Sequence, residues 1–191
     1  HGFPTRKDEE WKYTNVSALH KRASLAPDSI PPDPSPEAAL YVRTLSQAGT
    51  YLMVFVNGHY APGLSTVGGL PAGVRLESLA DILDDTAGQL QPFFATEHEH
   101  TVFASLNTAY ATDGAVLFLA PGTMLEAPIY LLFIASGDGA AIYPRNIIVV
   151  AEGARATVIE HYLGNLERHN FTDVVTQISL GAGAELQHYK L

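Results

Sequence analysis

The chain has 191 residues, 47% hydrophobic and 16% charged, which is typical of one folded domain or two small ones and not of a disordered chain. Eleven Lys and Arg against twenty Asp and Glu give a net charge of −9, which disfavours nucleic acid and anionic membranes as partners. The absence of cysteine excludes disulfides and thiolate metal sites within these residues.

The N-terminus has no apolar stretch of the kind found in signal peptides, and the apolar run at residues 129–135 is too short to span a bilayer. We therefore expect a cytoplasmic protein. The sequence begins at His1 and stops at Leu191 inside a strand-like pattern, so we expect both ends to be cut.

Residues 1–110 are predicted to form a small, mixed α/β and largely helical region. Residues 8–13 indicate a short helix with acidic residues near its positive end. Residues 26–36 hold five prolines and are predicted to be an extended linker. A helix is then expected from Pro36 to about residue 48, where Gly49 can end it.

The apolar run at residues 51–56 is followed by Asn57-Gly58, which is the strongest short signal for a β-hairpin. Two further helical patterns follow, one at residues 79–83 after Ser78 and one at about 101–110.

From about Gly114 the pattern becomes one of short strands separated by turn residues, with no amphipathic helix between them. The runs lie at residues 116–119, 129–134, 147–150, 157–159, 174–180 and 185–191. We therefore expect residues 111–191 to form a β core.

A weak internal repeat runs through this core. An aliphatic residue stands three positions before Gly122, Gly153 and Gly183, so the repeat recurs about every 30 residues. Such periods indicate stacked units, and the small residues Ala154, Ala156 and Ala184 suit the narrow interior of a β-solenoid. A β-sandwich or meander with chance similarity is the alternative.

Several segments resemble the SufB/SufD family of the SUF system for iron–sulfur cluster assembly. Residues 4–16, which include Trp11 and Tyr13, resemble the N-terminal signature of its SufD branch, and residues 143–160 resemble the family core. The core segment contains Pro144, Arg145, Asn146 and Glu160. Three shorter pieces fit the same family: residues 56–59 with Asn57 and Gly58, residues 113–115, and residues 126–129.

The resemblance implies a mainly β protein in which a right-handed parallel β-helix, a single-stranded solenoid, follows the N-terminal region. Family members are about twice as long, and the resemblance places the segment that docks the ATPase in the missing half. The implied partners are a SufB-like paralogue and a SufC-like ABC ATPase. The implied function is that of a scaffold subunit supporting cluster assembly and iron acquisition. The iron–sulfur cluster and ATP would be handled by the complex, with no cofactor in this segment.

The most ligand-like run is Thr96-Glu97-His98-Glu99-His100. His98 and His100 would share one face of a strand and could bind zinc, iron or manganese, but a site needs three or four converging ligands. A solvated loop before the next helix is the more common interpretation, and no metal site is predicted.

Glu160, His161 and His188 fall at the same end of neighbouring repeats. Stacking could bring an imidazole beside a carboxylate as an acid–base pair, aided by Arg145 or Arg168. More commonly, such side chains form a structural ladder of hydrogen bonds along one face of a solenoid. This interpretation also applies to His169. Trp11 is interpreted as an anchor for the N-terminal segment, with ligand stacking as the alternative.

Two functions follow from these observations. The first is a scaffold whose exposed strand edge binds other subunits, and its open edge should make this chain prone to self-association. The second is a β-solenoid enzyme acting on sugars or acyl groups through Glu160, His161 and His188. The sequence contains no nucleophile elbow and no phosphate-binding loop, which favours the first.

Overall fold

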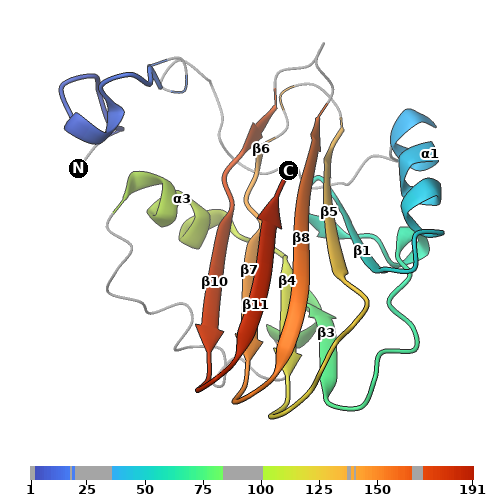
Figure 1. The fold of residues 1–191 in the computed structure, drawn as a ribbon. Coiled ribbons are helices and arrows are strands. Elements are labelled where there is room, and N and C mark those ends of the chain that lie inside the picture. The colour runs from blue at the N-terminus through green and yellow to red at the C-terminus, as the bar shows by residue number, and fades with distance from the viewer. Residues whose placement is uncertain are drawn as a thin grey trace.

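The structure is a computed structural model that describes residues 3–17, 19, 36–83, 101–136, 139, 141–164 and 170–191. The described part is mainly β with few helices (Figure 1). Its helical elements are a 3-10 helix at Glu9–Trp11, α1 (Pro36–Leu45), a 3-10 helix at Pro62–Leu64, a helical turn at residues 79–83, and α3 (Val102–Tyr110).

The strands are short, and most lie in the second half of the chain. They are β1 (Tyr51–Val56), β2 (His59–Tyr60), β3 (Val74–Ser78), β4 (Ala115–Leu119), β5 (Ile129–Ala135), β6 (Ala141–Ile142), β7 (Arg145–Val150), β8 (Arg155–Gly164), β9 (Phe171–Thr172), β10 (Val175–Leu180) and β11 (Glu185–Lys190). All six strand runs predicted after residue 114 are confirmed, five of them to within two residues at each end, while the run at 157–159 is part of the longer strand β8.

These strands form three sheets. The first has the order β11-β8-β5-β1-β2, the second β10-β7-β4-β3, and the third β6-β9. From β4 onward the chain visits the second, first and third sheets in turn, and every pairing among β4 to β11 is parallel. The antiparallel pairs, β1 with β2 and β3 with β4, lie at the edges of the first and second sheets that are opposite β11 and β10.

The strand register confirms the internal repeat. Arg145 pairs with Val175 and Arg155 with Glu185, so partners stand 30 positions apart. The three repeat glycines, Gly122, Gly153 and Gly183, all have positive φ, which glycine adopts without the steric cost of a Cβ atom. The parallel pairing rules out the antiparallel sandwich or meander.

The core lies between the first and second sheets. Its residues include Leu117, Leu131 and Ile148, all essentially without exposed surface. Ala154 and Ala156 are 1% exposed, and Ala184 packs against the same core, as expected for small inward residues. Burial of these apolar side chains between the two sheets is the main force that holds the sheets together.

The predicted hairpin is confirmed. β1 and β2 pair antiparallel with Val56 opposite His59, and Asn57 and Gly58 both have positive φ as a tight two-residue turn requires. The predicted helices at 36–48, 79–83 and 101–110 are present, α1 ending at Leu45, and the Thr101 side chain caps α3 by accepting from the Ala104 amide at 3.1 Å.

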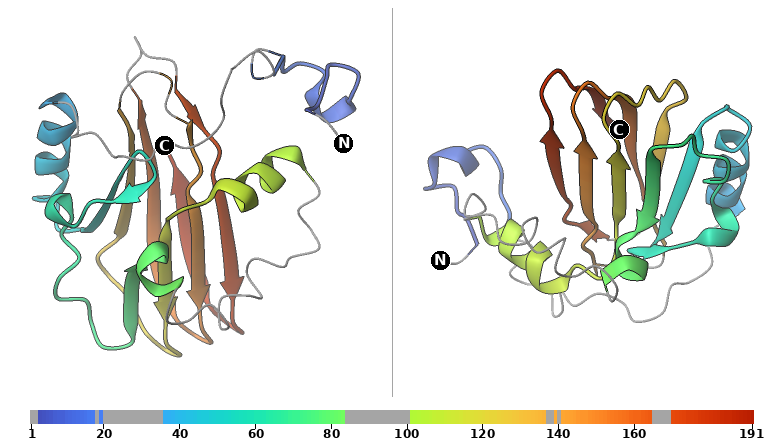
Figure 2. Two further views of the ribbon diagram at one scale, coloured as in Figure 1. Left: turned by 180° about the vertical axis from the view of Figure 1, so that it is seen from behind. Right: turned by 90° about the horizontal axis from the view of Figure 1, so that it is seen from below.

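The first hundred residues contribute more to the sheets than the sequence indicated. β1 pairs with β5 and β3 with β4, so both sheets extend across position 110. α1 covers the outer face of the first sheet and α3 lies on the opposite side of the molecule (Figure 2). The predicted linker at residues 26–36 lies almost wholly outside the described residues. No helix in the described segments is long and apolar enough to cross a membrane.

Candidate functional site

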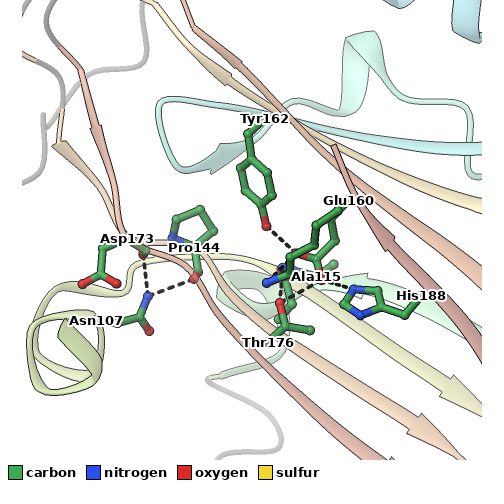
Figure 3. Close-up of polar contacts among 10 residues, drawn as sticks. Asn107, Ala115, Pro144, Glu160, Tyr162, Asp173, Thr176 and His188 are labelled. Carbon is green, nitrogen blue, oxygen red and sulfur yellow. Dashed lines mark hydrogen bonds and ion pairs between the residues drawn. The ribbon is translucent and has the colours of Figure 1, made fainter. Parts of the chain in front are cut away.

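The apolar core becomes polar near the last two strands. Glu160 of β8 points between the sheets and has no exposed surface. It forms a group with four donors from β8, β10 and β11, which we call the Glu160 cluster. Its members are Glu160, Tyr162, Thr176 and His188, which Figure 3 labels, and Lys190.

Each carboxylate oxygen of Glu160 has two donors. Oε1 accepts from Thr176 Oγ1 at 2.8 Å and from His188 Nε2 at 2.7 Å. Oε2 accepts from the Tyr162 hydroxyl, and Lys190 Nζ lies 3.5 Å away. Three hydrogen-bond partners and a neighbouring ammonium replace the water that a buried carboxylate loses.

Tyr162 remains a phenol in this environment. Burial raises its pKa well above the ordinary value, and the nearby Glu160 charge and the hydrogen bond to Glu160 raise it further. A contact with Asn146 acts in the opposite direction. Tyr162 therefore serves as a donor to Glu160 and is not a base.

Asn146 of β7 connects the Glu160 cluster to β4. Its Nδ2 donates to Thr176 Oγ1 at 3.3 Å, and its Oδ1 accepts from the Ala115 amide at 3.0 Å. Ala115, Asn146 and Thr176 belong to β4, β7 and β10, the three parallel neighbours of the second sheet. The side chain thus ties three successive strands together.

Arg145 is fully buried on the α3 side of the second sheet. Its guanidinium donates to Gln177 at 2.8 Å and, on α3, to Thr108 at 3.2 Å and Asn107 at 3.4 Å. Asn107 in turn donates to the backbone oxygens of Pro144 at 2.9 Å and Asp173 at 2.8 Å (Figure 3). Arg145 and Asn107 therefore attach α3 to the sheets.

Asp113 joins the first and second sheets near their N-terminal strands. Its carboxylate accepts from the Tyr60 amide, the Ser78 hydroxyl and the Ala80 and Gly114 amides, at 2.7 to 3.1 Å. Its neighbour Gly114 leaves no room for a side chain, because a Cβ atom there would lie 1.9 Å from the Arg145 carbonyl oxygen. Both positions belong to the family-like segment at residues 113–115.

His161 lies on the opposite face of β8 from Glu160, toward α1. Its Nδ1 is 2.6 Å from the Tyr130 hydroxyl and 3.1 Å from the Tyr41 hydroxyl. Burial lowers the His161 pKa, which favours the neutral ring as the acceptor for these phenols. His161 therefore helps to attach α1, and the structure does not bring it together with Glu160 and His188.

The N-terminal signature residues differ in their surroundings. The Trp11 ring packs 5.2 Å from Phe103 of α3, which fits an anchor, whereas Tyr13 is 91% exposed beside Lys12. His98, His100, Arg168 and His169 lie outside the described residues. Within the described ranges no group of three or more His, Cys, Asp or Glu could hold a metal ion.

The chemistry of the Glu160 cluster is that of a neutralised buried carboxylate. Glu160 and His188 are the residues that the sequence suggests as an acid–base pair. Both carboxylate oxygens of Glu160 already accept hydrogen bonds from side chains of this cluster. A cavity of about 330 Å³ lies elsewhere, beside the exposed ion pair of Arg155 and Glu185. The geometry of the Glu160 cluster favours a structural role, in which it holds strands β8, β10 and β11 in register.

Sequence reasoning missed Thr176, Tyr162 and Lys190 as members of the cluster. The 30-residue repeat carried a usable signal for Lys190, because it stands 30 positions after Glu160 and pairs with it across β8 and β11. Asn107 and Asp173 also escaped notice, since nothing in a single sequence shows that α3 covers β9.

Two family models match the chain in sequence order. Residues 1–131 match the SufBD protein N-terminal region, and residues 133–191 match the SUF system FeS cluster assembly, SufBD core domain.

Curated relatives agree. An iron–sulfur cluster assembly SufBD family protein of Synechocystis is 30% identical over 98% of this chain, and the iron–sulfur cluster assembly protein SufD of Escherichia coli is 32% identical over 100%. Protein ABCI7, chloroplastic, of Arabidopsis thaliana is 23% identical over 97%. The chain spans 43%, 42% and 40% of the lengths of these relatives, respectively. The resemblance seen in the sequence is confirmed: the chain belongs to the SufBD family.

Proposed function

We propose that this protein is a SufD-like scaffold subunit of the SUF machinery, working in the cytoplasm with a SufB-like paralogue and a SufC-like ATPase. The observation that carries the proposal is the match of two consecutive SufBD models along the whole chain. In this role it supports cluster assembly and iron acquisition by positioning partners. The cluster and the ATP belong to the complex, and this segment carries no cofactor of its own.

The proposed architecture is a right-handed parallel β-helix. Three features support it: the parallel pairing of β4 to β11, the repeated order of the three sheets, and partners 30 residues apart. Right-handedness follows from the strong general preference of parallel crossovers for that hand.

The surface proposed to receive another subunit or a further turn is the outer edge of the last strands. β10 and β11 each pair with one neighbour among the described strands. Large apolar side chains there are strongly exposed: Ile178 at 42%, Leu180 at 52%, Tyr189 at 51% and Leu191 at 64%. An open edge with apolar side chains favours pairing with further strands.

The enzyme alternative has less support. Glu160 and His188 are in contact, but His161 lies on the other face of β8 and Arg145 is held by α3 and Gln177. We propose a non-catalytic role for this segment.

Co-purification tests the proposal. The full-length protein, tagged and expressed with the SufB-like and SufC-like proteins of the same genome, should elute with both as one complex. If those two proteins associate with each other while the full-length protein elutes alone, the scaffold proposal is wrong.

A further inference from the structure

Among the described residues, Asp173 is a nearly buried acid with one carboxylate oxygen that has no hydrogen-bond partner. The residue is only 9% exposed, and no donor from the described part of the chain reaches its Oδ2 atom. In Figure 3 the contacts of Asn107 reach the backbone oxygen of Asp173 and leave its carboxyl group without a dashed line. A buried, unpartnered carboxylate is unfavourable, whereas a protonated carboxyl costs far less.

The carboxyl lies where α3 meets the sheets. Asp173 follows β9, and Asn107 of α3 bridges its backbone to that of Pro144. Aromatic rings continue the contact: Tyr110 packs 5.3 Å from Tyr143, and Tyr143 packs 5.9 Å from Phe171. Opening of this contact would expose the Asp173 Oδ2 atom to water.

The N-terminal segment depends on the same contact. Phe103 of α3 packs 6.5 Å from Phe171, 5.2 Å from Trp11 and 5.7 Å from Phe3. A loosening of α3 therefore changes the surroundings of Trp11, the only tryptophan in the chain.

We propose that the protonation of Asp173 controls how tightly α3 and the N-terminal segment are held against the sheets. With the proton present, the carboxyl is neutral and the contact stays closed. When the proton is lost, the buried charge favours an opened state in which water reaches the carboxylate.

The charged and titratable neighbours are consistent with this control. Burial raises the Asp173 pKa to about 6, so the change falls near neutral pH. Among the described residues, Tyr143 and Tyr110 face the site, and burial followed by the Asp173 charge raises the Tyr143 pKa to about 12. The Tyr143 phenol is therefore uncharged between pH 5 and 8. The Arg145 guanidinium donates to Asn107 and Thr108 in the same contact.

Hydrogen exchange of the α3 amides in the full-length protein tests the inference, after correction for the intrinsic pH dependence of exchange. The Asp173 pKa is about 6 in the closed state and 3.8 in an open state that hydrates the carboxyl fully. This difference makes opening about tenfold more frequent at pH 8 than at pH 5. Trp11 fluorescence should shift to longer wavelength with a midpoint near pH 6.

Matched variants assign the change to this residue. Asp173→Asn should abolish both pH effects, whereas Asp81→Asn, the same substitution at an exposed position, should retain them. The inference is overturned if α3 exchange in the wild-type protein is the same at pH 5 and pH 8. It is equally overturned if a folded Asp173→Asn protein keeps the tenfold change. The wild-type comparison decides the matter even if the variant does not fold.

Discussion

At the scale of single residues, the sequence places one carboxylate where the core is otherwise apolar. Glu160 faces Leu131 on one side of β8 and Lys190 on the other, and it has no exposed surface. Such a group is tolerated only when donors surround it, and removing one member of a buried pair costs more than the pair itself contributes.

Replacing Glu160 with Gln should therefore destabilise the protein. The amide has one oxygen in place of two and cannot accept from all four donors, and Lys190 loses its counter-charge. We expect the free energy of unfolding in urea to fall by about 2 kcal/mol or more. Glu152→Gln, at an exposed turn position, is the control and should change little. Equal stability of the two variants would show that the Glu160 cluster does not hold the turns.

Asp173 makes stability depend on pH in the direction opposite to an ordinary salt-bridged carboxylate. Its pKa is 3.8 in the unfolded chain and about 6 when folded, so the folded state holds the proton more tightly. Stability should therefore fall as the pH rises from about 4 to 6, losing about 2–3 kcal/mol by pH 7.5. Asp173→Asn should be more stable than the wild type at pH 7.5 and equal to it at pH 3 in urea titrations. A variant that is less stable at pH 7.5 would contradict this.

At the scale of elements, close approach between neighbouring strands limits substitution. Gly114 precedes β4, and a Cβ atom there would overlap the Arg145 carbonyl at the start of β7. The two strands could not remain at their pairing distance without a backbone shift.

Gly114→Ala should consequently lower the free energy of unfolding by about 1–3 kcal/mol. Gly63→Ala is the matched control, because nothing lies within 4 Å of its Cβ position and its φ is not positive. The control should stay within about 0.5 kcal/mol of the wild type. Thermal denaturation followed by circular dichroism measures both, and equal melting temperatures would refute the packing argument.

The elements predictable from sequence were those with strong local signals. Asn57-Gly58 specifies its turn through positive φ at both residues, and Thr101 caps α3 with its own side chain. β6 and β9 could not be predicted because they have two residues each and no room for a pattern. β3 escaped prediction because its place in the sheet depends on pairing with β4, whose partner residues lie 45 positions from Val74 and 37 positions from Ser78.

The polar contacts were harder to foresee than the strands. Strand register could have placed Lys190 beside Glu160. The other donors are not given by register, because Thr176 comes from the opposite sheet and Tyr162 from the same strand as Glu160. Which face of β8 points inward decides that His161 contacts Tyr130 and not Glu160. That choice depends on packing against other strands, which a single sequence does not show.

At the scale of the whole molecule, the exposed apolar edge of β10 and β11 has a measurable consequence. We expect the 191-residue chain to self-associate with rising concentration in size-exclusion chromatography with light scattering. The double variant Ile178→Lys and Leu180→Lys should stay monomeric, because charges oppose edge pairing. Met124→Lys, which changes an equally exposed side chain away from that edge, should associate like the wild type. A strictly monomeric wild-type chain would contradict an unprotected edge.

The role in cluster assembly is tested most directly by the iron and acid-labile sulfide content of a reporter iron–sulfur protein. It should be measured in cells of the source organism from which the full-length gene has been deleted. The account predicts a clear loss of both iron and sulfide, restored by the wild-type gene. Unchanged cluster content in the deletion strain, under conditions where the SUF machinery is the cell's source of clusters, would contradict it.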